Sequence, residues 1–264
     1  MFDALKRHWP EYLMEAAELG CFMISASLFA ILLFHPSSPA VRTIPSEFVR
    51  RMLMAIAMGG AAVSIVYSPW GKRSGAHMNP AITLAFFRLG KVAPWDAVFY
   101  VLAQFTGGMF GIVLVSAATA SLLSHPAINY VATLPGAYGA FAAFAAEVLI
   151  SFILVSVVLV VSNKPKLAPF TGLFAGLCVA TFITFEAPIS GMSMNPARTL
   201  GSALPAGVWN AIWIYFVAPP LAMLGAGQLY LRWRGAHRVF CAKYHHHNDE
   251  RCIFRCNYGA IHHE

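Results

Sequence analysis

The tripeptide Asn-Pro-Ala occurs twice in the chain, once in each half. The six residues of the two boxes are Asn79, Pro80, Ala81, Asn195, Pro196 and Ala197. Both boxes follow a Ser-Gly pair, at 74–75 and 190–191, and precede a Thr-Leu pair, at 83–84 and 199–200, with the same spacing. This repeated frame indicates that the two halves of the chain build the same object.

The residue types in the box suit the start of a helix. Asn is a preferred N-cap, and Pro fits the first helical position because the N–H that it lacks would have no partner there. We therefore expect Asn79 and Asn195 each to begin a helix, with the side-chain oxygen as the cap and the amide NH2 group free to donate. Two such helix ends facing each other inside a membrane would attract the oxygen of a neutral solute and repel a cation.

Composition predicts where these helices lie. The chain has 264 residues, of which 58% are hydrophobic and 11% are charged, against about 25% charged in soluble domains. Long apolar runs predict an integral membrane protein, and the net charge of +7 fits basic cytoplasmic loops and not nucleic-acid binding. The expected fold class is all-α, with six transmembrane helices at 12–34, 48–67, 94–122, 138–161, 169–185 and 208–231, and two half-helices at 79–89 and 195–204.

The count of spans sets the topology. Each half holds three spans and one half-helix, and an odd number of spans inverts one half relative to the other in the membrane. The half-helices then enter from opposite faces and meet near the midplane. The expected domains are an N-terminal segment (1–11), a membrane domain (12–231, with repeats at about 12–122 and 137–231) and a polar tail (232–264). The distribution of Lys and Arg places both termini in the cytoplasm, and we expect a plasma membrane.

The chain resembles the major intrinsic protein family, the aquaporins and glycerol facilitators, over about residues 11–231. The resemblance rests on both boxes and on Arg198, His77, Gln104, Gly107, Gly108, Glu147 and the segment 215–219. It implies an hourglass-shaped monomer with its own pore, assembled as a homotetramer in the lipid bilayer. The implied function is a passive channel for water and small uncharged solutes that excludes protons and ions, with no enzymatic activity and no required cofactor.

The resemblance also implies a narrow ring of four residues, which we place at Gly59, Ile183, Met192 and Arg198. Arg198 would act as a cation barrier, because its guanidinium stays charged and offers five donors. The alternative for Arg198 is a side chain that snorkels to the outer headgroups. If Gly59 removes a bulky wall and Ile183 removes a polar contact, the opening is wider and less polar than a filter for water alone.

Three further residues are expected to brace the half-helix loops. Glu18 and Glu147 lie within spans, where an ionisable group is costly unless it has a partner. The resemblance implies that both accept hydrogen bonds from the half-helix loops. His77 is expected to brace its own loop rather than to contact solute.

The polar tail is rich in metal-ligand residues. Within 16 residues it holds Cys241, His245, His246, His247, Cys252 and Cys256. These residue types suit Zn2+ or a similar metal, although their spacing matches no zinc-finger pattern. A redox or gating tail and an inert basic tail are the alternatives.

Two other functions stay open. A secondary transporter is possible because inverted repeats and broken helices also build transporters, although the half-helices bring only Asn79, Asn195, His77 and Arg198 to the midplane, a poor site for ion coupling. A structural or adhesion tetramer of the same fold is the other. No nucleophile–base pair is found in the membrane portion, which argues against an enzyme.

Overall fold

The computed structural model describes residues 1–119 and 121–258, and every described element is helical. Six helices are long and apolar enough to cross a membrane, which confirms the all-helical fold and the six spans. They are α1 (Phe2–Phe34), α3 (Glu47–Tyr67), α6 (Pro94–Thr119), α8 (Gly139–Ser162), α9 (Thr171–Phe185) with the preceding turn η2 (Ala168–Phe170), and α12 (Trp213–Arg234).

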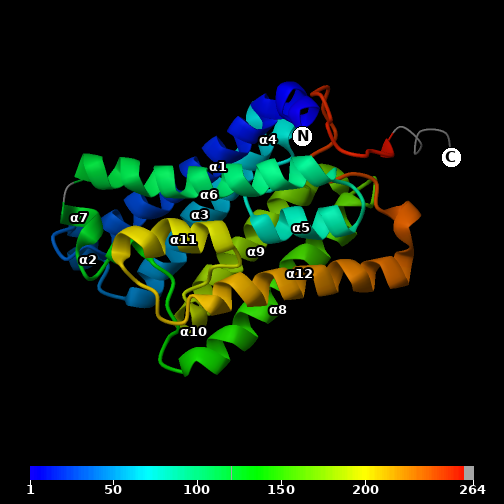
Figure 1. The fold of residues 1–264 in the computed structure, drawn as a ribbon. Helices are drawn as coiled ribbons and strands as arrows, with labels where there is room; N and C mark the ends of the chain where they lie inside the picture. The colour runs from blue at the N-terminus through cyan, green and yellow to red at the C-terminus, as the bar shows by residue number, and fades with distance from the viewer. Residues whose placement is uncertain (120, 259–264) are drawn as a thin grey trace.

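The two half-helices are α5 (Pro80–Arg88) and α11 (Pro196–Ala206). In Figure 1 they lie in opposite halves of the bundle, and both begin near its middle. Each follows a short helix, α4 (Pro69–Ser74) or α10 (Ala187–Ser190). This arrangement places the starts of α5 and α11 against each other inside the bundle, as the inverted repeat predicts.

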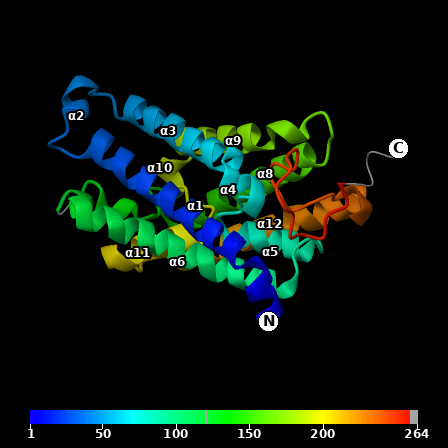
Figure 2. The ribbon, with the colours of Figure 1, turned by 90° about the horizontal axis from the view of Figure 1, so that it is seen from above.

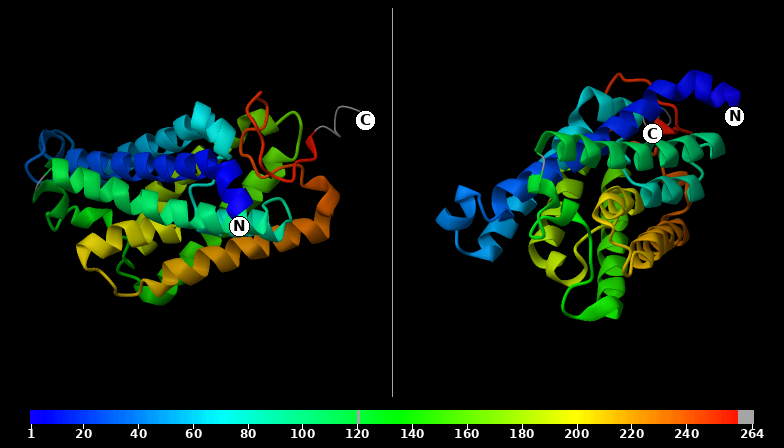
Figure 3. Two further views of the ribbon diagram at one scale, coloured as in Figure 1. Left: turned by 45° about the horizontal axis from the view of Figure 1, so that its top comes forward. Right: turned by 60° about the vertical axis from the view of Figure 1, so that its left-hand side comes forward.

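The two ends of the bundle differ. One end carries α2 (Pro39–Thr43), α7 (Ser121–Ser124) and the turn η1 (Asn129–Val131). The opposite end carries the turn η3 (Ala236–Arg238) and the rest of the tail, which lies across the bundle as an irregular chain (Figure 3). We call these the α2 end and the tail end.

The spans pack through small residues. Helix α1 lies beside α6, α12 beside α8, and α3 beside α9, the last pair joining the two halves (Figure 2). A Cβ atom at Gly107 of α6 would lie 1.9 Å from the carbonyl oxygen of Ala16, and one at Gly111 would lie 2.5 Å from that of Gly20. Only glycine permits this close approach of two backbones, which is how helices associate in lipid.

Several helix boundaries differ from those expected. Helix α1 begins at Phe2, so residues 2–11 continue the first span as helix. Helix α12 begins at Trp213 rather than 208, because the chain turns through left-handed backbone at Gly207 (φ 65°) and Ala211 (φ 55°). Helix ends are set by such local turns, which hydropathy does not report.

Candidate functional site

Both Asn-Pro-Ala boxes cap helices, as their residue types predict. The Oδ1 atom of Asn79 accepts a hydrogen bond from the backbone N–H of Ala81 at 2.9 Å. The Oδ1 atom of Asn195 accepts from the backbone N–H groups of Ala197 at 3.0 Å and Arg198 at 3.2 Å. Each asparagine therefore fixes the first turn of its half-helix.

Neither amide NH2 group of the two boxes is fully free, which corrects the sequence-based expectation. The Nδ2 atom of Asn79 donates to the carbonyl oxygen of Met194, and the Nδ2 atom of Asn195 donates to that of Met78, both at 2.7 Å. Each NH2 group has two N–H bonds, so one locks the two boxes together and the other remains for a bound molecule.

A buried carboxylate holds the backbone before each box. Glu15 accepts from the backbone N–H groups of His77 and Met78, both at 2.8 Å. Glu147 accepts from the matching N–H groups of Ser193 at 2.6 Å and Met194 at 2.7 Å. These bonds hold an unusual backbone, because Met78 (φ 50°) and Met194 (φ 54°) are left-handed, a conformation costly for residues other than glycine.

In the first half, Glu15 and Glu18 together accept the hydrogen bonds that Glu147 alone accepts in the second half. Glu147 also accepts from the Oγ atom of Ser190 at 2.8 Å, whereas the matching Ser74 donates to Glu18 at 2.7 Å. The sequence singled out Glu18 and missed Glu15. The signal was present, since Glu11, Glu15 and Glu18 are spaced to share one face of α1 and all three are buried.

A cavity of about 280 Å³ passes between the two boxes. Met78, Asn79, Met194 and Asn195 line its middle. Its wall toward the α2 end includes Phe34, Arg51, Met54, Met58, Ile183, Met192 and Arg198, and its wall toward the tail end includes Val66, Ala76, His77, Leu154, Ala175 and Tyr244. The cavity thus runs along the bundle axis with its few polar groups gathered around the boxes and the two arginines.

The sequence model of one family, described as Major intrinsic protein, matches residues 13–230. The chain belongs to the major intrinsic protein family. The match covers nearly all of the six spans, both boxes and every residue that lines the cavity except Tyr244, and it stops before the tail.

The relatives of this major intrinsic protein include plant aquaporins. It is 37% identical to aquaporin NIP6-1 of Arabidopsis thaliana over 201 residues, which cover 75% of this chain and 63% of that protein. It is 36% identical to aquaporin NIP2-1 of Oryza sativa subsp. japonica over 174 residues, which cover 65% of this chain and 56% of that protein. The chain therefore spans less than two thirds of the length of these relatives.

A solved structure supports the same fold. The aquaglyceroporin from Plasmodium falciparum superposes with a TM-score of 0.71 and covers 84% of this chain and 95% of its own. The two sequences are 21% identical, so the similarity shows a shared fold.

Three of the four residues expected at the constriction line the cavity of this major intrinsic protein, namely Ile183, Met192 and Arg198. The placement of Gly59 is wrong. A Cβ atom at Gly59 would lie 2.7 Å from the carbonyl oxygen of Gly176, so this position faces helix α9 and not the cavity. The cavity face of α3 is instead a stripe at helical spacing, made of Arg51, Met54, Met58, Ala62 and Val66.

Two arginines line the cavity toward the α2 end. The Nη1 atom of Arg198 is buried and has no hydrogen-bond partner among the described residues. Arg51 was not expected here. Its Nε atom donates to the carbonyl oxygen of Thr184 at 3.0 Å, and its guanidinium lies 3.6 Å from Glu47. The sequence placed Arg51 inside the second span, at 48–67, without a role in the pore, and its signal was its helical spacing from Met54 and Met58.

His77 is tied to its own half-helix and to the tail. Its Nδ1 atom lies 3.0 Å from Oγ1 of Thr83, and its Nε2 atom lies 2.9 Å from the carbonyl oxygen of Ala242. The imidazole stacks between the rings of Phe86 and Phe254. His77 also borders the cavity, so its bracing role and its contact with the pore coexist.

The structure gathers four of the six tail residues that were expected to suit a metal. Cys241, His246, Cys252 and Cys256 present ligand atoms that all lie within 4.8 Å of one another. His245 lies outside this group, against the ring of Tyr67 with centroids 5.0 Å apart. His247 also lies outside it, against the ring of Tyr258.

Proposed function

We propose that the protein is a passive transmembrane channel for water and other small uncharged solutes. The observation that carries this proposal is the cavity that passes between Asn79 and Asn195, each of which caps a half-helix and keeps one N–H available. A passing solute oxygen can accept those N–H bonds in the middle of the membrane. The named aquaporin relatives and the shared fold support the same function.

Ion exclusion follows from the charges around the cavity. The N-terminal ends of α5 and α11 meet at its middle and carry partial positive charge. Arg198, which lines the cavity, adds a full positive charge. The same groups repel cations and can donate hydrogen bonds to a neutral hydroxyl, which is the general basis of aquaporin-type selectivity.

The solute class follows from the cavity walls. Met54, Met58, Ile183 and Met192 line the part next to Arg198, so one side is apolar and deformable while the other donates hydrogen bonds. Such a wall suits a small molecule with both carbon and hydroxyl surface, such as glycerol, in addition to water.

A secondary transporter fits the cavity less well. Among the described residues that line it, none is Asp or Glu, and Glu15 and Glu147 are engaged with backbone N–H groups behind the boxes. We therefore expect no coupling to an ion gradient. Glycerol uptake into proteoliposomes should be equal with and without an imposed Na+ or proton gradient. Accumulation of glycerol above its external concentration would refute a passive channel.

We also propose that the chain forms a homotetramer in a plasma membrane with both termini in the cytoplasm. The tail reaches the N-terminal helix, where Arg251 donates to the carbonyl oxygen of Arg7 at 3.0 Å, so the described parts of both terminal segments meet at the tail end. That end also holds the basic residues Lys72, Arg73 and Arg88. Light scattering of the purified protein in detergent tests the tetramer, and labelling of an introduced terminal cysteine in intact cells tests the orientation.

A further inference from the structure

The tail docks on the loop that leads into the first Asn-Pro-Ala box. The carbonyl oxygen of Ala242 accepts from Nε2 of His77 at 2.9 Å, and the backbone N–H of Tyr244 donates to the carbonyl oxygen of Gly75 at 3.2 Å. The ring of Phe254 stacks on His77 with centroids 5.4 Å apart. The tail therefore touches the pore-forming loop itself and not only the rim of the bundle.

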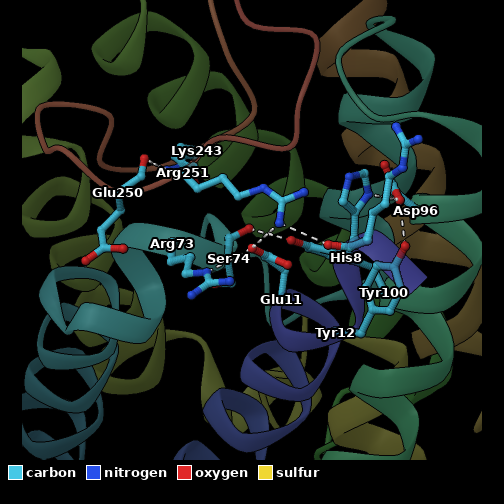
Figure 4. Close-up of polar contacts among 11 residues, drawn as sticks. His8, Glu11, Tyr12, Arg73, Ser74, Asp96, Tyr100, Lys243, Glu250 and Arg251 are labelled. Carbon is cyan, nitrogen blue, oxygen red and sulfur yellow. Dashed lines mark hydrogen bonds and ion pairs between the residues drawn. The ribbon is translucent and has the colours of Figure 1, made fainter. Parts of the chain in front are cut away.

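Further contacts anchor the tail to both halves of the protein. The backbone N–H of Phe240 donates to Oδ1 of Asn163, which follows α8, at 2.7 Å. Arg251 lies 4.0 Å from Glu11 of α1, which also binds Arg73 at 2.9 Å (Figure 4). The docked tail thus spans the tail end of the bundle.

Tyr244 lines the cavity at this end. Its side chain forms part of the cavity wall together with Val66, Ala76 and His77, and it is only 5% exposed. Ala242, two residues earlier, is fully buried. The tail therefore contributes a residue of its own to the wall of the cavity.

The segment that presents this ring is irregular. Residues 239–257 form neither helix nor strand, although several of them are buried. Ordering each backbone residue costs about 1–2 kcal/mol, and a short irregular segment usually needs a disulfide or a metal to offset that cost. We therefore expect a cross-link, either a disulfide or a bound metal ion, to stabilise the docked tail.

The cluster of Cys241, His246, Cys252 and Cys256 has the geometry of a metal centre. The Sγ atoms of Cys241 and Cys252 lie 3.5 Å apart, and Sγ of Cys256 lies 3.0 Å from Nε2 of His246. With Zn–S bonds of about 2.3 Å, a tetrahedral site has sulfur–sulfur edges of about 3.8 Å. One ion at the centre can therefore reach all four ligands, and three thiols with one imidazole suit Zn2+.

The ligands close the two loops that contact the pore. Ala242 and Tyr244 lie in the loop between Cys241 and His246, and Phe254 lies in the loop between Cys252 and Cys256. Binding one ion at all four positions fixes both loops at once. Metal binding is thereby coupled to the placement of Tyr244.

Lys243 supports both the loops and the charge of such a centre. It is 2% exposed, and its Nζ atom donates to the carbonyl oxygens of Glu250 at 3.1 Å and Arg251 at 2.8 Å. Lys243 lies two residues after Cys241, between two of the ligand positions in the sequence. Three thiolates and a neutral imidazole around Zn2+ leave one net negative charge, which this ammonium offsets.

We propose that Cys241, His246, Cys252 and Cys256 bind one Zn2+ ion and that the zinc-bound tail closes the pore with Tyr244. Zinc-loaded protein then conducts less than zinc-free protein. The gating half rests on the proposed channel function, whereas the metal site does not.

Metal content tests the site alone. Full-length protein is purified under reducing conditions, loaded with Zn2+, desalted and analysed by mass spectrometry for zinc per chain. We expect one ion in the wild type and in the control C21S, whose thiol is exposed on α1 outside the cluster. We expect a loss of that ion in C252S and C256S, and the absorption of tetrahedral thiolate-bound Co2+ when Co2+ replaces Zn2+ in the wild type. Absence of stoichiometric zinc, unchanged zinc in C252S, or a Cys241–Cys252 disulfide in the same preparation would overturn the site.

Flux tests the gate. Wild-type protein is either zinc-loaded or stripped with a chelator in detergent before reconstitution, so that no unfolded variant is needed. A ligand that binds only the docked tail shifts the docking equilibrium by the factor 1 + [Zn]/Kd, so free zinc at about ten times Kd favours the docked tail by about tenfold. We expect stripping to raise water flux by up to this factor. Y244A should be fast in both states and still bind one zinc. Equal flux in the two wild-type states, or a zinc response retained in Y244A, would overturn the gate. Bound zinc with no flux in any form would overturn the channel function and the gate while leaving the zinc site intact.

Discussion

Glu15 offers a sharp test of how the pore loops are held. Its Oε1 atom accepts from the N–H of His77, and its Oε2 atom accepts from the N–H of Met78 and from Nε2 of Gln104, all at 2.8 Å. In Glu15→Gln the amide NH2 must replace one of these oxygens. If the NH2 group faces His77, the N–H of His77 loses its acceptor. If it faces Met78, both the N–H of Met78 and Nε2 of Gln104 lose theirs.

The expected cost of Glu15→Gln follows from the better orientation. One buried N–H without an acceptor costs about 1–3 kcal/mol. For a chain of this size, 1 kcal/mol corresponds to about 2–4 °C, so a cost of about 2 kcal/mol lowers the melting temperature by about 4–8 °C. Water flux should fall as well, because Met78 supplies the carbonyl that holds Asn195.

The matched control for Glu15→Gln is Glu18→Gln. Among the described residues Glu18 accepts from Oγ of Ser74, and a glutamine oxygen can keep that bond while the NH2 group takes the place of Oε2, which is buried and has no partner, so no backbone N–H loses its acceptor. We expect Glu18→Gln to melt higher than Glu15→Gln, because it keeps the bond to Ser74 and takes no acceptor away from the backbone of the loop. Scanning fluorimetry of the purified proteins in one detergent measures both variants. Equal melting temperatures for the two would refute the assignment of Glu15 as the residue that holds the first loop.

The remaining predictions concern the α2 end and the helix contacts. Arg198→Ala should keep water flux and admit a proton or cation leak, measured with a pH-sensitive dye inside proteoliposomes; unchanged ion exclusion would contradict its barrier role. Gly59→Ala should destabilise the fold by about 1–3 kcal/mol through its clash with α9 and leave the solute preference unchanged, whereas Met58→Ala should change the ratio of glycerol to water flux. A changed ratio of glycerol to water flux in Gly59→Ala would instead support the sequence-based placement of Gly59 at the constriction. Burial raises the pKa of Glu186, just beyond α9, from its ordinary value of 4.5 to about 7. The folded state therefore favours the protonated carboxyl, and the stability that it contributes is present below about pH 4.5 and lost as the pH rises through 7. Glu186→Gln should thus melt higher than the wild type at pH 8, with the difference closing near pH 4.5; a difference independent of pH would refute this.

The pore boxes were predictable from the sequence because their chemistry is local. An Asn followed by Pro defines a helix start within three residues, and the repeat itself showed that the two starts belong together. The six spans followed from hydropathy in the same way. Gly59 was placed from the family resemblance, whereas the residue of α3 that lines the cavity is its neighbour Met58. One residue along a helix turns the side chain by about 100°, enough to move it from the cavity to the facing helix.

Contacts that join distant backbone atoms escaped the sequence. The spacing of Glu11, Glu15 and Glu18 indicates a shared face of α1, but the partners of Glu15 are the N–H groups of residues 77 and 78, which any residue type would supply, so the sequence does not identify them. The docking of the tail was missed for the same reason. Ala242 and Tyr244 bind the pore loop through main-chain atoms, and the segment has no hydrophobic period. In the tail the ligand types predicted a metal site, but only the structure distinguishes His246 from its two histidine neighbours.

The most direct test of the channel is stopped-flow light scattering on proteoliposomes that hold zinc-stripped protein. An osmotic step with an impermeant sugar is followed by one with glycerol, and empty liposomes serve as the reference. The proposed function predicts fast shrinkage in sugar, and fast shrinkage followed by reswelling in glycerol. Shrinkage without reswelling would contradict the wider solute class and leave a filter for water alone. Rates equal to those of empty liposomes, in both the wild type and Y244A, would contradict the channel itself.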